Sequence, residues 1–205
     1  MIRSDMPELQ IPDIGQLLGP YLDQVAPDLR PRFLATLERG AAERYRHWAN
    51  VLPEHAGSLL ACAAGEDEIA DRVEALFPLD ESMREQLLAP LPGARDAYVG
   101  VLAGLDVWDQ LKVQASAERQ GAQAWRALAA THTDAHVVAE LEVCSMLEES
   151  SAARLDAPHH RQAAEAHGPG DRRPPAGRPA PAPAARPGAS ARLPAQHRDG
   201  RDDPA

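Results

Sequence analysis

Cysteines are scarce in this sequence, and long apolar runs are missing altogether. Its two cysteines, Cys62 and Cys144, lie far apart and form no CxxC pair, which argues against a disulfide framework and a zinc ribbon. No apolar stretch approaches the length that spans a bilayer, and the first residues lack the apolar segment of a secretory signal. We therefore expect a reduced, cytoplasmic protein that has no membrane as a partner.

Strand signals are also missing. Residues 1–157 contain few β-branched runs and no segment in which apolar and polar residues strictly alternate. Apolar residues recur instead at the three- and four-residue spacing of helices. The sequence therefore predicts an all-α fold.

Negative charge dominates the chain before residue 158. The whole chain carries a formal net charge of −10, and residues 158–205, with eight Arg and five acidic residues, carry about +3. Residues 1–157 therefore carry about −13. Because such a surface repels phosphate backbones, we expect no nucleic-acid partner.

The composition changes abruptly after Ala157. Residues 158–205 hold ten of the nineteen prolines and contain no Ile, Val, Phe, Trp or Tyr. A segment of this kind buries too little apolar surface to offset the entropy lost on ordering, which predicts a helical domain over 1–157 and a disordered Pro/Ala/Arg-rich tail. Out-of-frame translation of GC-rich DNA gives the same composition, so a frameshift origin and a natural flexible tail both stay open.

Proline, glycine and capping residues divide the domain into helices. A short amphipathic helix is expected over residues 12–26, and Asp28 is the expected N-cap of a long helix that Pro53 ends. Further helices are expected over 54–77, from Asp80 to residue 88, over 95–130 with a bend near Gly100 and Gly104, and over 135–157.

The chain also resembles itself. Residues 38–49 align with 118–129, and residues 59–75 align with 141–157, with 11 identities in 29 positions. The pattern predicts an antiparallel helix pair that occurs twice, so that four helices form a bundle with a crossover connection of some fifteen to twenty residues. The helix over 12–26 is then an extra N-terminal element.

Four glutamates interrupt the apolar stripes of these helices. Glu38 and Glu66 lie equally far from the first hairpin turn, and Glu118 and Glu148 lie equally far from the second. Residues equally far from an antiparallel turn share one level, so we expect all four carboxylates in one layer. Burying several carboxylates is costly unless they are paired, protonated or bound to metal, and hard cations favour oxygen ligands.

At this point the chain resembles the ferritin-like superfamily, over about residues 30–157. Those proteins duplicate a helix pair across a crossover, with one Glu from one helix of each pair and Glu-x-x-His from the other. The resemblance implies a di-metal centre of iron or manganese, held by Glu38, Glu66, Glu118 and Glu148. Ile69 and Ser151 stand where the two histidines belong.

Two functions therefore stay open. The first is a non-catalytic or degenerate ferritin-like bundle that acts through a protein partner or as a homo-oligomer, which the missing histidines favour. The second is a carboxylate-bridged di-metal protein or oxidoreductase. The layer also has plainer interpretations. Rotated helices could expose the acids, or the acids could transfer protons without a metal. In a third interpretation, nearby arginines neutralise the acids; the candidates are Arg39, Arg46, Arg119 and Arg126.

Overall fold

The computed structural model of the chain describes residues 9–166, and it describes the side chains of residues 9–157. Within that range every regular element is helical and no strand occurs, so the predicted all-α class is confirmed. The helices are α1 (Ile14–Leu22), α2 (Arg30–Val51), α3 (Ala56–Leu76), α4 (Glu81–Leu88), α5 (Leu91–Leu102), α6 (Val107–Ala129) and α7 (Ala135–Ala166), with short 3₁₀ turns at Pro27–Leu29 and Pro53–His55.

The start of α1 follows from its cap, whereas the start of α2 does not. The side chain of Asp13 accepts a hydrogen bond from the Gln16 amide at 2.9 Å and caps α1, which therefore begins at Ile14. Since α1 ends at Leu22, it is shorter at both ends than the expected helix over 12–26. The prediction that Asp28 caps the next helix is wrong, because Asp28 lies inside a 3₁₀ turn and no side chain caps α2. Proline in the first turn of α2 is tolerated, since that position needs no amide donor.

The expected single helix over residues 95–130 is two helices. The chain leaves the helical path after Leu102, where Gly104 takes a φ of 80°, a value that only glycine adopts without strain. Asp106 then caps α6 by accepting a hydrogen bond from the Asp109 amide at 2.9 Å. As a result the connection between α3 and α6 is longer than predicted and contains two helices of its own, α4 and α5.

The last helix continues further than expected. Its backbone stays helical through Ala166, nine residues beyond the predicted end at Ala157. The segment after Pro158 contains Arg, Gln, Glu and three alanines up to that point, which all favour helix and outweigh the single proline. The rest of the predicted tail, residues 167–205, lies outside the described residues.

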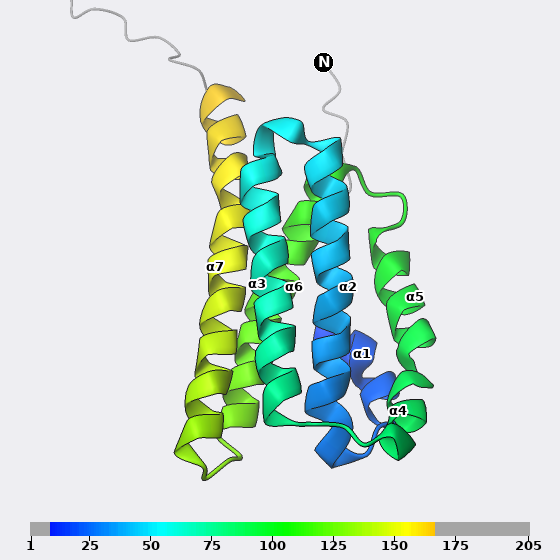
Figure 1. Ribbon diagram of the computed structural model, residues 1–205. Helices are drawn as coiled ribbons and strands as arrows, with labels where there is room; N and C mark the ends of the chain where they lie inside the picture. Colours follow the sequence, from blue (N-terminus) through cyan, green and yellow to red (C-terminus); the bar gives the residue numbers. More distant parts are fainter. Residues whose placement is uncertain (1–8, 167–205) are drawn as a thin grey trace, which may run out of the picture. The chain divides into compact units, whose positions relative to one another are not determined.

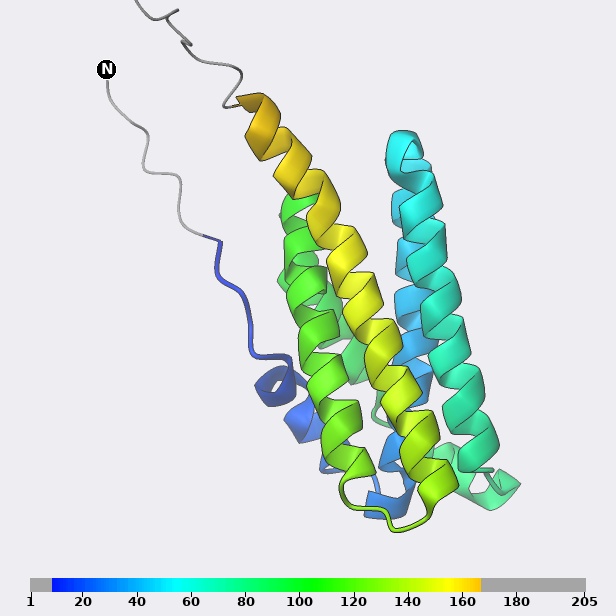
Figure 2. The same cartoon turned by 90° about the vertical axis from the view of Figure 1, so that its left-hand side faces the viewer.

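The four long helices run side by side (Figures 1 and 2). α2 packs along α3, α6 packs along α7, and α3 packs against α7. Side chains connect α2 to α6, since the Trp48 indole donates a hydrogen bond to the Gln110 side chain at 2.9 Å. The short helices cover this fourth side, because α1 contacts both α5 and α6 while α5 also contacts α2.

Matching positions of the two aligned segments carry matching ion pairs. In each hairpin an arginine of the first helix binds an acidic residue of the second, at equivalent places in both copies. The pairs are Arg46–Asp67 with Arg126–Glu149, and Arg39–Glu74 with Arg119–Asp156. These contacts fix the register of α2 on α3 and of α6 on α7.

None of the helices in residues 9–166 combines the length and the apolarity that crossing a bilayer requires.

Candidate metal centre

The apolar core between the long helices is divided into two clusters, and a layer of glutamates separates them. One cluster includes Tyr45, Trp48, Leu59, Cys62, Leu111 and Leu155, and the other includes Ile69, Val73, Trp125, Leu141 and Cys144. Along α3 the residue between the two clusters is Glu66, along α6 it is Glu118, along α7 it is Glu148 and along α2 it is Glu38.

Carboxylates from the four long helices meet in this layer. One oxygen each of Glu38, Glu66 and Glu148 lies within 4.8 Å of the other two. The carboxyl of Glu118 lies within hydrogen-bonding reach of those of Glu66 and Glu148, so a proton can be shared between them. Glu66 is 0% exposed, Glu118 3% and Glu148 2%, whereas Glu38 is only half-buried because it faces a cavity. The interpretation in which rotated helices expose these acids is therefore wrong.

Neutral donors hold the carboxylates in place. The Tyr45 hydroxyl and the Gln114 amide donate hydrogen bonds to one oxygen of Glu118 at 2.7 and 2.5 Å. The Trp125 indole donates to Glu148 at 3.0 Å. A further hydrogen bond, 3.2 Å long, joins the Ser151 hydroxyl to Glu66.

Two oxygens of the layer have no partner. Oε2 of Glu66 and Oε2 of Glu118 are buried and accept no hydrogen bond. A buried acceptor without a donor is costly, and such groups are rare in folded proteins. The layer therefore contains unused ligand capacity at two buried carboxylates.

The pKa values of Glu38, Glu66 and Glu148 are raised. Burial, and then the charge of Glu118, raises the pKa of Glu38 from 4.5 to about 8, although Arg44 opposes the shift. Burial and the neighbouring carboxyls raise the pKa of Glu66 and Glu148 well above 4.5. The layer in the folded protein therefore holds protons at neutral pH unless another cation replaces them.

Arginines do not neutralise the layer. Each of the four arginines named above binds acidic residues at the surface instead, among them Asp67, Glu149 and Asp156. Within residues 9–157 no ion pair involves any of the four layer glutamates. The predicted alternative of arginine pairing is therefore wrong.

A glycine makes room for one of the carboxylates. A Cβ atom added at Gly121 would lie 2.6 Å from Oε1, 2.8 Å from Cδ and 3.0 Å from Oε2 of Glu148. The first two distances are shorter than a carbon atom tolerates, so the Glu148 carboxyl would have to move. Ala41 stands at the matching position of the first hairpin, so this close approach belongs to the second copy alone.

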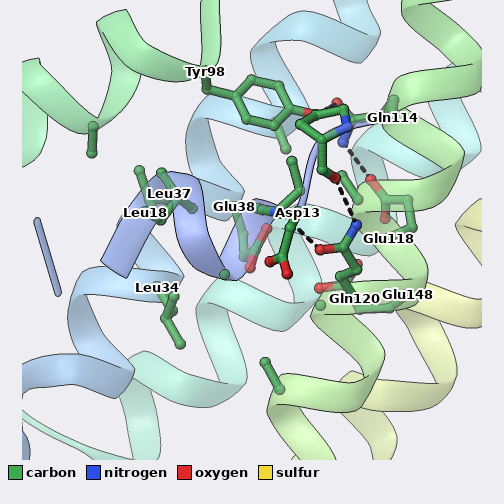
Figure 3. Close-up of a pocket in the computed structure, with 18 of the residues that line it drawn as sticks. Asp13, Leu18, Leu34, Leu37, Glu38, Tyr98, Gln114, Glu118, Gln120 and Glu148 are labelled. Atoms are coloured by element: carbon green, nitrogen blue, oxygen red, sulfur yellow. Dashed lines mark hydrogen bonds between the residues drawn. The ribbon is translucent and has the colours of Figure 1, made fainter. Parts of the chain in front are cut away.

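A cavity of about 640 Å³ reaches the layer from the side covered by α1 and α5. Figure 3 shows Glu38, Glu118 and Glu148 among the residues that line it. Its other walls are largely apolar and include Leu18, Leu34 and Leu37. Ile11 on the wall is 46% exposed, so the cavity is open to solvent and small molecules can reach the carboxylates.

The residues present fit a divalent cation. Each glutamate supplies hard oxygen ligands, and the two unpartnered oxygens of Glu66 and Glu118 are themselves buried. Oxygens on opposite sides of one Ca²⁺ ion lie about 5 Å apart, and those around a smaller ion about 4 Å apart. The spacing of up to 4.8 Å therefore suits one cation between three carboxylates after a small adjustment.

Sequence reasoning missed the donors around the acids. Tyr45 and Trp125 lie in the core, and apolar periodicity gives no sign of their hydrogen bonds to glutamate. His55 packs on Trp108 near the first turn, away from the layer. Cys62 belongs to the core, and burial raises its pKa to about 12.

The comparisons with known proteins give no family. No family model matches the chain, and neither a curated protein nor a solved structure matches it. The assignment of a function therefore rests on the layer and the cavity.

Proposed function

We propose that this protein binds divalent metal ions in its glutamate layer. The observation that carries the proposal is the meeting of four carboxylates, none of which forms an ion pair within residues 9–157. Two of them have a buried oxygen without a partner. A bound cation would satisfy these oxygens and remove the repulsion between the acids, which protons achieve only in part.

The proposed architecture is a four-helix bundle of the ferritin-like type, built from a duplicated helix pair. The matching ion pairs of the two hairpins support duplication, because they recur at equivalent positions together with the glutamates. The extra helix α1 and the inserted helices α4 and α5 are the parts that this repeat does not explain.

The ligand set favours manganese over iron. All four candidate ligands are carboxylates. The two positions where the ferritin-like pattern has histidine offer no further ligand, because Ile69 lies in the apolar core and the Ser151 hydroxyl donates a hydrogen bond to Glu66. Carboxylate and water ligands suit Mn²⁺, whereas imidazole ligands would favour iron and zinc. An oxidoreductase activity would in addition need access for a substrate, which the adjoining cavity offers.

Titration calorimetry of the full chain tests the proposal. We expect stoichiometric binding of Mn²⁺ to chelator-treated protein, and anaerobic binding of Fe²⁺ with lower affinity. Glu66→Gln should abolish binding, because it removes a central ligand while keeping the shape of the side chain. Glu142→Gln, an exposed position on α7, is the matched control and should bind as the wild type does. A wild-type protein that binds neither ion would disprove the metal function.

A protein-binding role is the second candidate, and the missing histidines favour it. In that case the layer is a remnant, and the protein acts through its surface as a homo-oligomer or with a protein partner. Exposed apolar side chains such as Val99 and Met146, at 56% and 64%, are available for such contacts. Light scattering across a range of concentrations tests self-association, and a monomer throughout would rule out the homo-oligomer.

A further inference from the structure

Two arginines approach each other at the cavity. A Cβ atom added at Gly40 would lie 3.7 Å from the Nη1 atom of Arg44 and 3.8 Å from the Nε atom of Arg95. The guanidinium groups of α2 and α5 therefore converge over the same point, and both residues line the cavity. Bringing two cations together is unfavourable unless an anion lies between or beside them.

Neither arginine is within ion-pair distance of an acid in the described part of the chain, although the charge of Arg44 does act on the nearby Glu38. No ion pair or hydrogen bond involves Arg44 or Arg95 among residues 9–157, and the Nε atom of Arg44 is buried without an acceptor. Arg44 stacks on Tyr98 instead, with its guanidinium carbon 4.5 Å from the ring centroid. Stacking fixes the plane of the guanidinium and leaves its donors free for a ligand.

Most of the cavity wall is apolar. Helix α1 contributes Leu18 and Leu22, and α2 contributes Leu34 and Leu37. A cavity of about 640 Å³ lies within the range that encloses small organic ligands. The walls therefore suit a hydrocarbon body, and the arginines suit a single anionic head.

We propose that the cavity binds an organic acid with an apolar body, whose carboxylate lies between Arg44 and Arg95. Guanidinium groups recognise carboxylates through paired hydrogen bonds, and the leucines of α1 and α2 exclude water from the body of the ligand. The positive charge that an anion needs comes from these two guanidinium groups, because the cavity wall also carries four acids, namely Asp13, Glu38, Glu118 and Glu148. The ligand is thus held beside the glutamate layer, which is where the substrate of a metal site would lie.

The test uses metal-free full-length protein and decanoate as the probe. We expect one decanoate to bind per chain in titration calorimetry. Decanol, which keeps the body but not the charge, and acetate, which keeps only the head, should each bind roughly tenfold more weakly or not at all. Absence of decanoate binding, or decanol binding as tightly as decanoate, would overturn the proposal.

Variants locate the head of the ligand. Arg95→Gln and Arg44→Gln should each weaken decanoate binding roughly tenfold. Arg95 is exposed, so its substitution should not disturb folding even if Arg44→Gln does. Arg84→Gln, an exposed arginine on α4, is the control and should leave binding unchanged. Wild-type affinity in Arg95→Gln would contradict the assignment.

This inference adds a ligand class to the proposed metal function, yet the two can fail separately. Decanoate binding is measured without metal, and Glu66, the residue that tests metal binding, does not line the cavity. Decanoate binding without Mn²⁺ binding would leave the cavity proposal standing alone, and Mn²⁺ binding without decanoate binding would do the reverse.

Discussion

Replacing Glu66 by glutamine should change how the stability of the metal-free protein depends on pH. Glu66 is fully buried and accepts one hydrogen bond, from Ser151. Its pKa is raised by burial first, and then by the carboxyls of Glu118 and Glu38. Glutamine keeps the size and the acceptor oxygen of the side chain but has no proton to lose.

The expected magnitude follows from proton linkage. A carboxyl whose pKa is raised on folding keeps its proton in the folded protein and loses it in the unfolded chain above pH 4.5. Unfolding then releases a proton, so the free energy of unfolding falls by about 1.4 kcal/mol per pH unit for each such carboxyl. This stabilisation is complete below pH 4.5 and is lost as the pH rises towards the folded pKa, which is about 8 for Glu38. Three carboxyls together, Glu38, Glu66 and Glu148, give a slope of up to about 4 kcal/mol per pH unit.

Urea unfolding followed by circular dichroism measures this slope. The protein is unfolded between pH 5.5 and 7.5 with a chelator present. Glu66→Gln should reduce the slope by about 1.4 kcal/mol per pH unit relative to wild type, so that the variant gains on wild type as the pH rises. Glu142→Gln, which removes an exposed carboxylate, should leave the slope unchanged. Parallel curves for wild type and Glu66→Gln would refute the claim that Glu66 is buried as a neutral acid.

Two further substitutions test the surroundings of the layer. Gly121→Ala places a methyl group against the Glu148 carboxyl, so we expect a loss of about 1–3 kcal/mol in the free energy of unfolding. Gly57→Ala is the control and should cause no loss, because no neighbouring atom lies within 4 Å of the added carbon. Equal losses in both variants would contradict the close approach. Tyr45→Phe removes the hydroxyl that donates to Glu118, so we expect the free energy of unfolding to fall by about 1–3 kcal/mol while the circular dichroism spectrum of the helices stays unchanged. A variant as stable as wild type would show that this hydrogen bond contributes little.

The layer could be predicted because helix geometry determines both the face and the height of a residue. Glu66 interrupts an apolar stripe, so it must face the core, and its distance from the hairpin turn fixes the level at which it lies. The same reasoning places Glu118 and Glu148. The partners of these acids could not be predicted in this way, because periodicity shows that Tyr45 and Trp125 are buried but not which polar atoms their donors reach.

The break between α5 and α6 shows a second limit. Apolar periodicity continues across residues 95–130, so one helix with a bend near Gly100 and Gly104 was expected rather than two helices. The break depends on Gly104, whose positive φ is a backbone property that the pattern of apolar residues does not reveal. Asp106 carried a usable signal, since aspartate is one of the preferred N-cap residues. With the break in place, α5 can pack on α2 and bring Arg95 to the cavity.

Anomalous diffraction from crystals of the full chain grown with Mn²⁺ tests the central claim most directly. The account predicts a strong anomalous peak within coordination distance of Glu38, Glu66 and Glu148. Glu118 lies beside this ion or binds a second one. Peaks confined to surface acids such as Asp71, together with a glutamate layer that contains no anomalous density, would contradict it.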